Sequence, residues 1–561
     1  MHLLHLVSFL LAIGLVSVAS RLPDLAALPP KTVALVTLSG GRSHATPLLE
    51  VGKELRLRNH TVLFGTYTDQ LRWAPDSAFD RLIDLGPGLD KARERNIYAS
   101  LQNWTTMYEQ FRAMLRSKTD FNFSFDRVYL RLLDEFSRQR PDVLVCDYLV
   151  DPCKDLSAKL KVPFIFMFPN MPFRIPRESF QPNVMVESTT TESLSFFQRL
   201  GIWFEPYLLI PEIIRYHLSY NRMRAKAGLG RHVEEPRLPN QLFLINSFWG
   251  LEPARTIPPT VELVGPLLAD TYPPLTQDLA DFLELHPRTV YVSFGTHAHL
   301  SLKQSEALLN GLLRAVDYGR IDGIVWSIGQ TSIANFPREA AGRNITDLLG
   351  NRNPNLYFIP FAPQRALLGH PHTRLFVTHG GGESGNEAIY AGKPVIVLPF
   401  FADQLFNAAR MSAAGIGRKL DRLHFTAHDV FSLVTGILTD EDGEIQRNVE
   451  RMKLLARLRA RSSKQHAADL VEEMMYHHEA WTDHGRLEPG PLKGFSTHRV
   501  LASNWMPYIK ANEIDLKLFI LGTVSLLGWL LFKWVRTPTR KEMEKRRRPK
   551  FHFRDIRKEK Q

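Results

Sequence analysis

The sequence predicts an α/β protein of two doubly wound domains that face each other, followed by a C-terminal transmembrane helix. β-rich runs alternate with helical segments in two separate blocks, which is the order of elements in a parallel sheet covered by helices. A Pro-rich stretch at residues 253–275 separates the two blocks, and both ends of the 561-residue chain are hydrophobic. The length alone allows about two to four domains.

Composition excludes several classes of protein. Hydrophobic residues make up 44% of the chain and charged residues 23%, as in globular proteins, so the chain is neither disordered nor fibrous. Two cysteines, Cys146 and Cys153, exclude a disulfide framework and a Cys-rich zinc module, and a bond between them would close a very small loop. Residues 536–561 hold twelve Lys/Arg and four Asp/Glu, or +8 of the net charge of +12. Because the basicity lies in this tail, we expect no nucleic-acid partner.

Residues 1–20 are expected to be a signal peptide. The run from Leu3 to Val18 is almost uninterrupted apolar sequence, and small residues at positions 18 and 20 suit cleavage after position 20. The segment carries His2 and His5 but no Lys or Arg before the apolar run, so a buried first strand or helix is the alternative.

Residues 516–535 are expected to span a membrane. The apolar run that begins at Leu518 is short for a hydrocarbon core of about 30 Å, but Lys533 can snorkel and Trp534 can lie at the interface. The positive-inside rule places the basic tail, residues 536–561, in the cytosol. We therefore expect a single-pass type I protein of the endoplasmic reticulum membrane with its bulk in the lumen. A core helix followed by a solvated tail is the alternative.

Four N-x-S/T sequons fit a luminal location and stand at Asn59, Asn103, Asn122 and Asn344. A long chain contains such triplets by chance, so their support is slight. Asn59 is expected in a tight turn from a helix to a strand, where it can escape modification.

The first block, residues 21–255, opens with a strand at 31–38 that meets a loop of small residues, Ser39 to His44. A helix is expected from about Pro47, because proline is favoured in a first turn. Three further runs predict strands at 61–64, 142–146 and 163–167, whereas residues 70–140 are interpreted as helices.

The second block, residues 256–475, repeats this order of elements. A helix is expected at 303–315, and five apolar runs predict strands at 289–293, 324–327, 356–359, 375–378 and 395–398. Residues 476–515 are interpreted as return helices and a juxtamembrane segment.

The residues that carry chemistry are concentrated between positions 359 and 407. His379 follows a predicted strand at its carboxyl end, and the glycines after it let the backbone approach a ligand closely. The next helix is expected to start near Ser384, so its free N–H groups form an anion site that suits a diphosphate. Asp403 and Gln404 offer acceptors and an amide that suit sugar hydroxyls.

This run reads FAPQRALLGHPHTRLFVTHGGGESGNEAIYAGKPVIVLPFFADQLFNAARM and resembles the signature of the UDP-glucuronosyltransferase/UDP-glucosyltransferase family, the family 1 glycosyltransferases, in its membrane-anchored animal-type form. The resemblance implies a GT-B fold, in which two Rossmann-like domains face each other and bind the acceptor and the UDP-sugar. It also implies inverting transfer with no metal and no cofactor besides the co-substrate UDP-sugar. The expected acceptor is small and lipophilic, and a homo-oligomer is left open.

The resemblance further implies how the nucleotide is held. Phe361 would stack on uracil with Gln364 nearby, and Glu387 would accept the ribose hydroxyls. His379 would contact the diphosphate. It would be joined by the hydroxyl of Thr296 and by the backbone that follows the strand, at Gly380, Gly381 and Ser384.

Four residues are assigned to the sugar and to catalysis. Asp403 and Gln404 would hold the sugar, the family's catalytic histidine falls on His44, and its orienting aspartate falls on Asp147. An imidazole is a suitable base at neutral pH for a hydroxyl proton, and a carboxylate on its other nitrogen fixes the tautomer. The alternative is structural: His44 would cap a helix and Asp147 would bind a turn amide.

Glu383 departs from the family, which usually has asparagine at this position. A carboxylate beside a diphosphate is repulsive by about 1–4 kcal/mol for a screened contact near 4 Å. We therefore expect Glu383 to turn toward a sugar hydroxyl or toward solvent, while Ser384 supplies the polar contact. A non-catalytic, regulatory UDP-sugar-binding paralogue is the alternative function.

Other polar groups receive structural interpretations. The D-x-D at Asp440 to Asp442 is interpreted as a solvated turn rather than a metal-sugar motif, and Cys153 as packing in a buried helix. Of four further histidines, one of His297 and His299 is a candidate for the sugar region, whereas His370 and His372 are expected on the surface.

Overall fold

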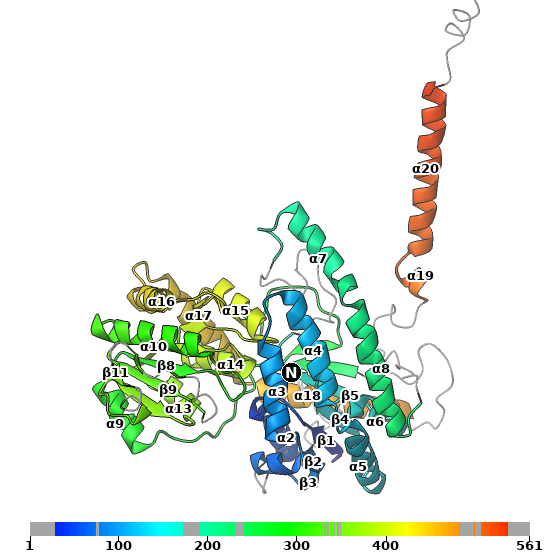
Figure 1. Ribbon diagram of the computed structural model, residues 1–561. Coiled ribbons are helices and arrows are strands. Elements are labelled where there is room, and N and C mark those ends of the chain that lie inside the picture. The colour runs from blue at the N-terminus through cyan, green and yellow to red at the C-terminus, as the bar shows by residue number, and fades with distance from the viewer. Residues whose placement is uncertain are drawn as a thin grey trace, which may run out of the picture. The chain divides into compact units, whose positions relative to one another are not determined.

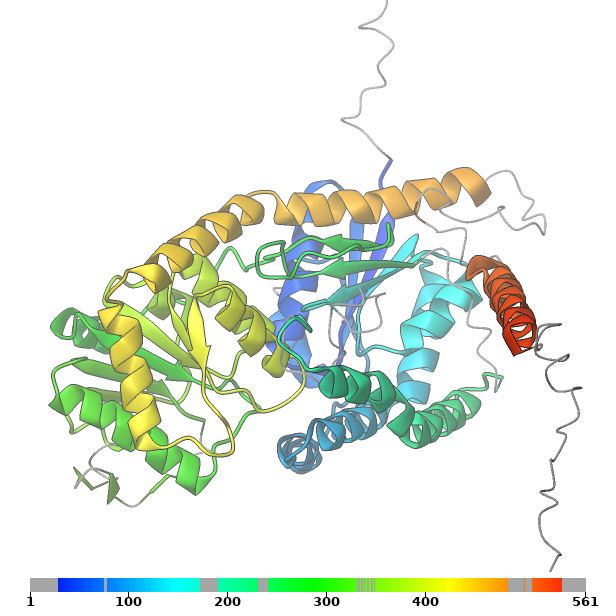
Figure 2. The ribbon, with the colours of Figure 1, turned by 90° about the horizontal axis from the view of Figure 1, so that it is seen from above.

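The computed structural model describes residues 29–74, 78–171, 190–230, 241–329, isolated positions between 333 and 349, 350–482, 499 and 507–536 (Figures 1 and 2). The signal peptide expected at residues 1–20 lies outside these residues, and so does the basic tail after Arg536. Residues 29–499 belong to one compact unit and the C-terminal segment to a second.

The first lobe is built on a parallel sheet of seven strands. In sheet order the strands are β3 (Arg81–Asp84), β2 (Thr61–Thr66), β1 (Thr32–Val36), β4 (Val143–Asp147), β5 (Phe164–Phe168), β6 (Gln241–Ile245) and β7 (Val261–Leu263). The order reverses between β1 and β4, so their carboxyl ends form the topological switch point where such sheets bind ligands.

Helices cover both faces of this sheet, which is why strands such as β4 are buried along their whole length. The helices between its strands are α2 (Arg42–Leu57), the 3₁₀ helix η1 (Thr68–Trp73), α3 (Lys91–Gln102), α4 (Met107–Phe121), α5 (Phe125–Arg138), α6 (Pro152–Leu160), α7 (Phe196–Leu208) and α8 (Ile210–Lys226). Local signals set their ends: Thr106 and Glu109 form a capping box that starts α4.

The second lobe is built on a parallel sheet of six strands. In sheet order these are β12 (Leu356–Ile359), β9 (Gly323–Ser327), β8 (Thr289–Ser293), β13 (Thr373–Thr378), β14 (Val395–Val397) and β15 (Gly417–Lys419). Its switch point lies between β8 and β13. A separate antiparallel pair consists of β10 (Glu339–Ala340) and β11 (Arg343–Asn344).

In the part of this lobe that the structure describes, seven helices have defined bounds. They are α9 (Gln277–Leu285), α10 (Leu302–Asp317), α13 (Gln364–Gly369), α14 (Gly382–Ala391), α15 (Gln404–Ala413), α16 (Ala427–Thr439) and α17 (Glu444–Ala460). The two doubly wound sheets confirm the predicted fold class.

Three expectations about the first lobe were wrong. Residues 70–140 are not wholly helical, because Arg81–Asp84 pairs with β2 as an edge strand. The helix expected from Pro47 begins at Arg42 instead, after two glycines with positive φ, and Pro47 lies inside it. The boundary at 255/256 is too early, since Val261–Leu263 pairs with β6 and completes the first sheet.

The chain also returns to the first lobe at α18 (Ser463–Thr482), drawn in orange in Figure 2. Its apolar face, which includes Ala467 and Val471, packs into one cluster with Val33 and Leu35 of β1. Residues 463–475 therefore complete the core of the first lobe, although the sequence had assigned them to the second domain.

Several hydrogen bonds and an ion pair join the two lobes. The Trp104 indole N–H donates to the carbonyl oxygen of Phe400 at 2.7 Å, and the Gln102 amide binds the carbonyl of His297 at 3.0 Å. The Arg410 guanidinium pairs with the Glu252 carboxylate at 2.9 Å. These contacts fix the carboxyl ends of the two sheets near one another, and this region is called the interlobe junction below.

The C-terminal unit contains α19 (Tyr508–Ala511) and α20 (Ile514–Arg536). Among the described residues, α20 is the one helix long and apolar enough to cross a membrane. It includes the whole of the span predicted at 516–535.

Candidate active site

His44 and Asp147 lie together at the switch point of the first sheet. His44 is in the first turn of α2, and Asp147 is the last residue of β4, the strand next to β1. The imidazole Nδ1 lies 2.8 Å from the Asp147 Oδ2. A carboxylate accepts the proton of Nδ1, so the lone pair of the neutral ring is on Nε2. The contact predicted from the resemblance is present.

Glycine is required where β1 turns into α2. Gly40 has φ of 92° and Gly41 has φ of 78°, in the left-handed region that other residues rarely adopt. A Cβ on Gly40 would lie 2.2 Å from Cδ2 of His44. The small residues therefore let the imidazole fold back against the turn.

Opposing effects act on the pKa of His44. Burial lowers it, but the charge and hydrogen bond of Asp147 raise it, as do Asp403 and Glu383 of the second lobe. The resulting pKa is above the ordinary value for histidine. The Asp147 carboxylate also accepts the N–H of Leu149 at 3.0 Å, so it satisfies a turn amide and His44 at once.

Tyr148, which the sequence analysis did not single out, borders this pair. Its ring centroid is 5.5 Å from that of His44, and it stacks on Phe168 with centroids 4.9 Å apart. Its position directly after Asp147 is the signal that could have identified it. The two rings provide an apolar surface beside the candidate base.

His379 occupies the corresponding switch point of the second lobe, directly after β13. Gly380 has φ of 83°, and a Cβ on Gly381 would lie 2.5 Å from His379 Nε2. Burial lowers the pKa of His379 to about 4, so the ring is neutral at neutral pH. A neutral imidazole at this place can donate one N–H to an anion at the start of α14.

Gln364, Ser384 and Glu387 form a hydrogen-bonded group. The Gln364 amide donates to Ser384 Oγ at 3.0 Å and to Glu387 Oε2 at 2.7 Å, while Tyr291 O–H donates to Gln364 Oε1 at 3.2 Å. Burial raises the pKa of Glu387, against the opposing hydrogen bond from Gln364. Gln364 therefore positions the carboxylate that is assigned to the ribose.

Phe361 and Thr296 are both exposed, at the ends of β12 and β8. Phe361 has 71% of its surface exposed, so its ring is free to stack on a base. Thr296 follows Gly295, at which a Cβ would lie 3.1 Å from the His379 ring. The loop after β8 thus lies against the candidate diphosphate histidine.

Asp403 and Gln404 start α15 and have different surroundings. The Gln404 side-chain carbonyl accepts the N–H groups of Phe400 and Phe401 at 2.9 and 3.2 Å, so this buried residue holds the preceding loop. Asp403 accepts a hydrogen bond from Asn407 at 2.9 Å, and its Oδ2 is 3.8 Å from the Cβ position of Gly382. Burial raises the pKa of Asp403, and His44 opposes that rise.

Glu383 faces the first lobe. It lies in the first turn of α14, and three residues of α2, Arg42, His44 and Thr46, act on its carboxyl group. Burial and the neighbouring Glu387 raise its pKa well above the usual range, against the effects of Thr46, Arg42 and His44. The side chain is therefore buried and does not face solvent, and the expected contact with a sugar hydroxyl stays a prediction.

His297 also lies at the interlobe junction. Its ring stacks on Tyr98 of the first lobe with centroids 4.0 Å apart, and burial lowers its pKa to about 4. Its buried Nε2 has no hydrogen-bonding partner among the residues that the structure describes, and it is 3.4 Å from the Cβ position of Gly41. His299 is held by its backbone N–H, which donates to Gln102 at 2.9 Å.

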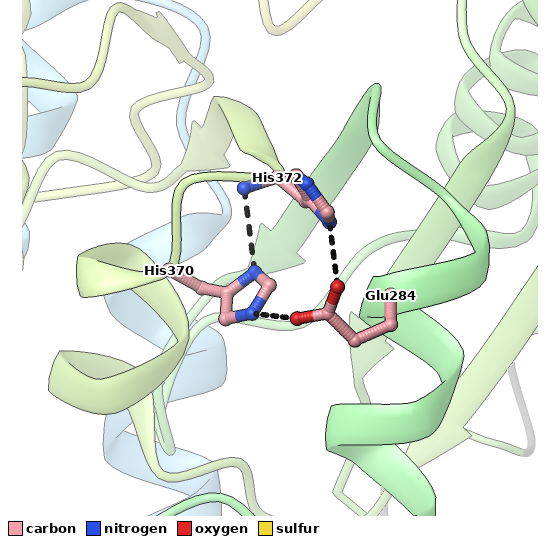
Figure 3. Close-up of side chains that lie close together, drawn as sticks. All are labelled: Glu284, His370 and His372. Atoms are coloured by element: carbon pink, nitrogen blue, oxygen red, sulfur yellow. Dashed lines mark hydrogen bonds and ion pairs between the residues drawn. The ribbon is translucent and has the colours of Figure 1, made fainter.

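One three-residue group in the described part of the chain has the composition of a metal site. The ligand atoms of Glu284, His370 and His372 all lie within 4.8 Å of one another (Figure 3). His370 Nδ1 accepts the backbone N–H of His372 at 3.3 Å, so its proton is on Nε2, which lies 3.3 Å from Glu284 Oε1. The group precedes β13, at the end opposite His379, and is held by its own hydrogen bonds.

Several smaller expectations have structural outcomes. Cys153 lies in a buried helix as predicted, but its thiol is not free, because it forms a disulfide with Cys146. Asp440 ends α16, and its carboxylate accepts two backbone N–H groups at the start of α17, so the D-x-D is a turn.

The sequons differ in exposure. Asn59 is exposed at positive φ in the predicted turn, and Asn103 and Asn344 are also exposed. Asn122 is only 3% exposed and its amide donates to Asp151 at 2.7 Å, which leaves no route for a glycan in the folded chain. Asn122 is therefore a poor acceptor site, contrary to the expectation.

The two doubly wound lobes have their switch points at one junction. One side of this junction carries a histidine–aspartate pair, and the other carries the glycine-rich start of a helix. This arrangement defines a GT-B-type nucleotide-sugar transferase. Solved structures agree on the fold. The glycosyltransferase of kitacinnamycin matches with a TM-score of 0.58 at 20% identity, covering 80% of this chain and 100% of that one. A Phytolacca americana UGT2 complexed with UDP-2fluoro-glucose and pterostilbene matches with a TM-score of 0.53 at 19% identity, covering 80% and 100%.

The chain belongs to the UDP-glucoronosyl and UDP-glucosyl transferase family, whose model matches residues 92–486. A UDP-glycosyltransferase of Talaromyces amestolkiae is 30% identical over 90% of this chain and 98% of its own length. Human UDP-glucuronosyltransferase 2B17 is 24% identical over 80% of this chain and 81% of its own. The protein is thus a transferase enzyme that moves a sugar from a UDP-sugar.

Proposed function

We propose that the protein transfers a hexosyl group from a UDP-hexose to the hydroxyl, or a similar nucleophile, of a small lipophilic acceptor. The transfer inverts the anomeric centre, uses no metal and has His44 as its base. The observation that carries this proposal is the 2.8 Å contact between His44 and Asp147 at a junction shared with the start of α14.

The step divides between the two lobes. His44 Nε2 takes the acceptor's hydroxyl proton as the oxygen attacks the anomeric carbon, and Asp147 stabilises the imidazolium that forms. The bond from that carbon to the β-phosphate oxygen breaks on the opposite face, and UDP leaves with the negative charge. The N–H groups at the start of α14 and the N–H of neutral His379 stabilise that charge.

Electrostatics favours a neutral hexose over a uronic acid. The attacked carbon must lie close to His44, and Glu383 and Asp403 both act on His44 from the second lobe. Their own pKa values are raised mainly by burial, so cations do not compensate them fully. Raised pKa values mean that this site disfavours negative charge, so the carboxylate of a uronate would be unfavourable here, whereas hexose hydroxyls can hydrogen-bond to both acidic groups.

The acceptor side is aromatic. Tyr148 lies beside His44 and stacks on Phe168, which suits a flat, apolar molecule that carries one reacting hydroxyl. The Phytolacca structure holds pterostilbene, a compound of this kind. We therefore propose lipophilic phenols and alcohols as the acceptors.

The proposed location is the endoplasmic reticulum membrane. The apolar helix α20 supports a single-pass anchor, and the basic residues after it support a cytosolic tail and luminal lobes. Protease added to intact microsomes should then remove only the segment after about Arg536. Digestion of residues 29–499 with protection of the tail would contradict this topology.

The reaction is tested by measuring UDP release from a panel of UDP-sugars in the presence of phenols. Turnover with UDP-glucose or another neutral donor is expected, with slower turnover of UDP-glucuronic acid. Tight UDP-sugar binding without turnover of any donor would favour the non-catalytic paralogue instead.

A further inference from the structure

Helices α7 and α8 expose an apolar surface that the active site does not use. On α7, 79% of Phe197 and 60% of Trp203 are exposed to solvent. Ile214 and Leu218 continue the exposed set on α8, and four more α7 side chains are over half exposed: Phe196, Phe204, Tyr207 and Leu208. These residues are called the α7–α8 surface below.

Helix α8 and its junction with α7 are held to α4. Leu209, between α7 and α8, is buried against Phe111 of α4. Glu212 of α8 pairs with Arg112 and Arg116 of α4 at 3.4 and 3.3 Å. Figure 1 shows α7 and α8 following one another along the outside of the first lobe. Helix α8 is therefore held to the lobe, and α7 extends from it with its apolar side chains exposed.

Soluble monomers rarely expose contiguous apolar surface of this extent, so a partner is expected. Aromatic side chains such as Trp203 and Tyr207 prefer the boundary between water and lipid, where an apolar ring and a polar atom are both satisfied. The charge around this surface also favours a lipid partner. Arg112, Arg116 and Arg215 all contact the single Glu212 carboxylate and remain partly exposed, so the border of the surface is positive.

A positive border suits anionic lipid headgroups, whereas a second copy of the chain would place these arginines against one another. We propose that the α7–α8 surface lies in the interfacial layer of a lipid bilayer, the same membrane that α20 is proposed to span. The first lobe then makes its own contact with lipid, in addition to the anchor α20. Lipophilic acceptors that partition into the bilayer would be concentrated at this surface.

The disulfide allows a single introduced cysteine to be labelled selectively. Both cysteines of the chain are bonded to each other, so an introduced cysteine is the one free thiol. The full chain carrying Phe197→Cys or Phe204→Cys is labelled with an environment-sensitive fluorophore and reconstituted into nanodiscs of phosphatidylcholine and phosphatidylserine. Lipids brominated near the headgroup, at the depth of about 5–10 Å that interfacial helices reach, serve as quenchers. Leu57→Cys, at an 80% exposed position of α2, is the matched control, and Leu527→Cys in α20 reports the anchor.

We expect strong quenching and a blue-shifted emission at positions 197 and 204, little change at 57, and less quenching when phosphatidylserine is omitted. Quenching at 527 alone would overturn the inference and leave the anchor standing. Quenching at 197 and 204 without 527 would sustain the surface and contradict the anchor. An emission shift that follows protein concentration instead of lipid would mean that a second copy covers the surface, and the inference would fail.

Discussion

The two switch points of the molecule have the same turn from a strand to a helix beside a histidine, but the two histidines differ in pKa. In each lobe a strand ends in paired glycines of which one or both have positive φ, a helix follows, and a histidine stands beside the turn. His44 has a carboxylate at 2.8 Å and a raised pKa, whereas burial lowers the pKa of His379 to about 4. The comparison teaches that the neighbour supplied by the adjacent strand, and not the turn itself, sets the pKa of the imidazole, which suits His44 to the proposed role of base and His379 to that of donor.

The largest effect should come from removing the base. His44→Ala should lower turnover by about 10²–10⁴, the usual contribution of a general base, with little change in UDP affinity. Steady-state rates and calorimetric UDP titration measure the two quantities. His424→Ala, at an exposed position of the second lobe bonded to Asp421, is the control and should leave both unchanged. Equal losses of rate and UDP affinity in the His44 variant would show that the residue is structural.

Replacing His379 should weaken UDP binding, whereas replacing His44 should mainly lower turnover. His379→Ala removes a donor to the charged diphosphate, which is worth about 1.5–3 kcal/mol, or roughly ten- to a hundredfold in the Kd for UDP. Titration with UDP alone is sufficient, because the diphosphate is present without the sugar. An unchanged affinity would contradict the role given to His379.

A Glu383 variant tests the proposed contact between this residue and the sugar of the donor. Glu383→Gln keeps the shape and removes an ionisable group whose pKa is raised to about 8. Above that pH, where the wild-type carboxylate is charged, a neutral UDP-hexose should bind the variant more weakly by about 1–3 kcal/mol, while UDP is unaffected. The same variant should narrow the discrimination against UDP-glucuronic acid. Tighter binding of UDP itself would instead mean that the carboxylate faces the diphosphate.

The smallest effect is a displacement of the pH profile. The base works only when unprotonated, so kcat should fall as pH drops through the pKa of His44. Asp147→Asn removes the main charge that raises this pKa, and burial then dominates, so the midpoint of the residual activity should move to lower pH. His379→Ala should not move it, because His379 is already neutral in this range. A profile that keeps its midpoint without Asp147 would assign it to another group.

How far the sequence predicts this molecule depends on whether the signal is local. β1, β4, β8 and β13 are continuous apolar runs, and the turns after them are marked by glycines, so the strands that carry the site could be predicted. Edge strands such as Val261–Leu263 were missed because three residues in a Pro-rich stretch give little pattern.

Contacts between lobes were harder to predict than strands. Nothing in the sequence places Thr46 opposite Glu383 or His297 on Tyr98, since each pair is brought together by the docking of two sheets. Gln404 shows the same difficulty within one lobe. Its residue type suits a sugar, but its side-chain carbonyl is occupied by the amides of the preceding loop.

Helix α18 ties the first lobe to the last part of the compact unit to be synthesised. Its apolar face fills the core beside β1, and Glu472 in the middle of the helix bonds to His60 at 2.8 Å. During translation the strands of the first sheet emerge hundreds of residues before this helix, and their core stays incomplete until residues 463–482 have been made. The apolar core of the nascent first lobe therefore stays partly exposed until the whole second lobe has left the ribosome. A premature stop codon between positions 264 and 462 should consequently yield a chain that cells degrade, even though every residue of the first sheet is present.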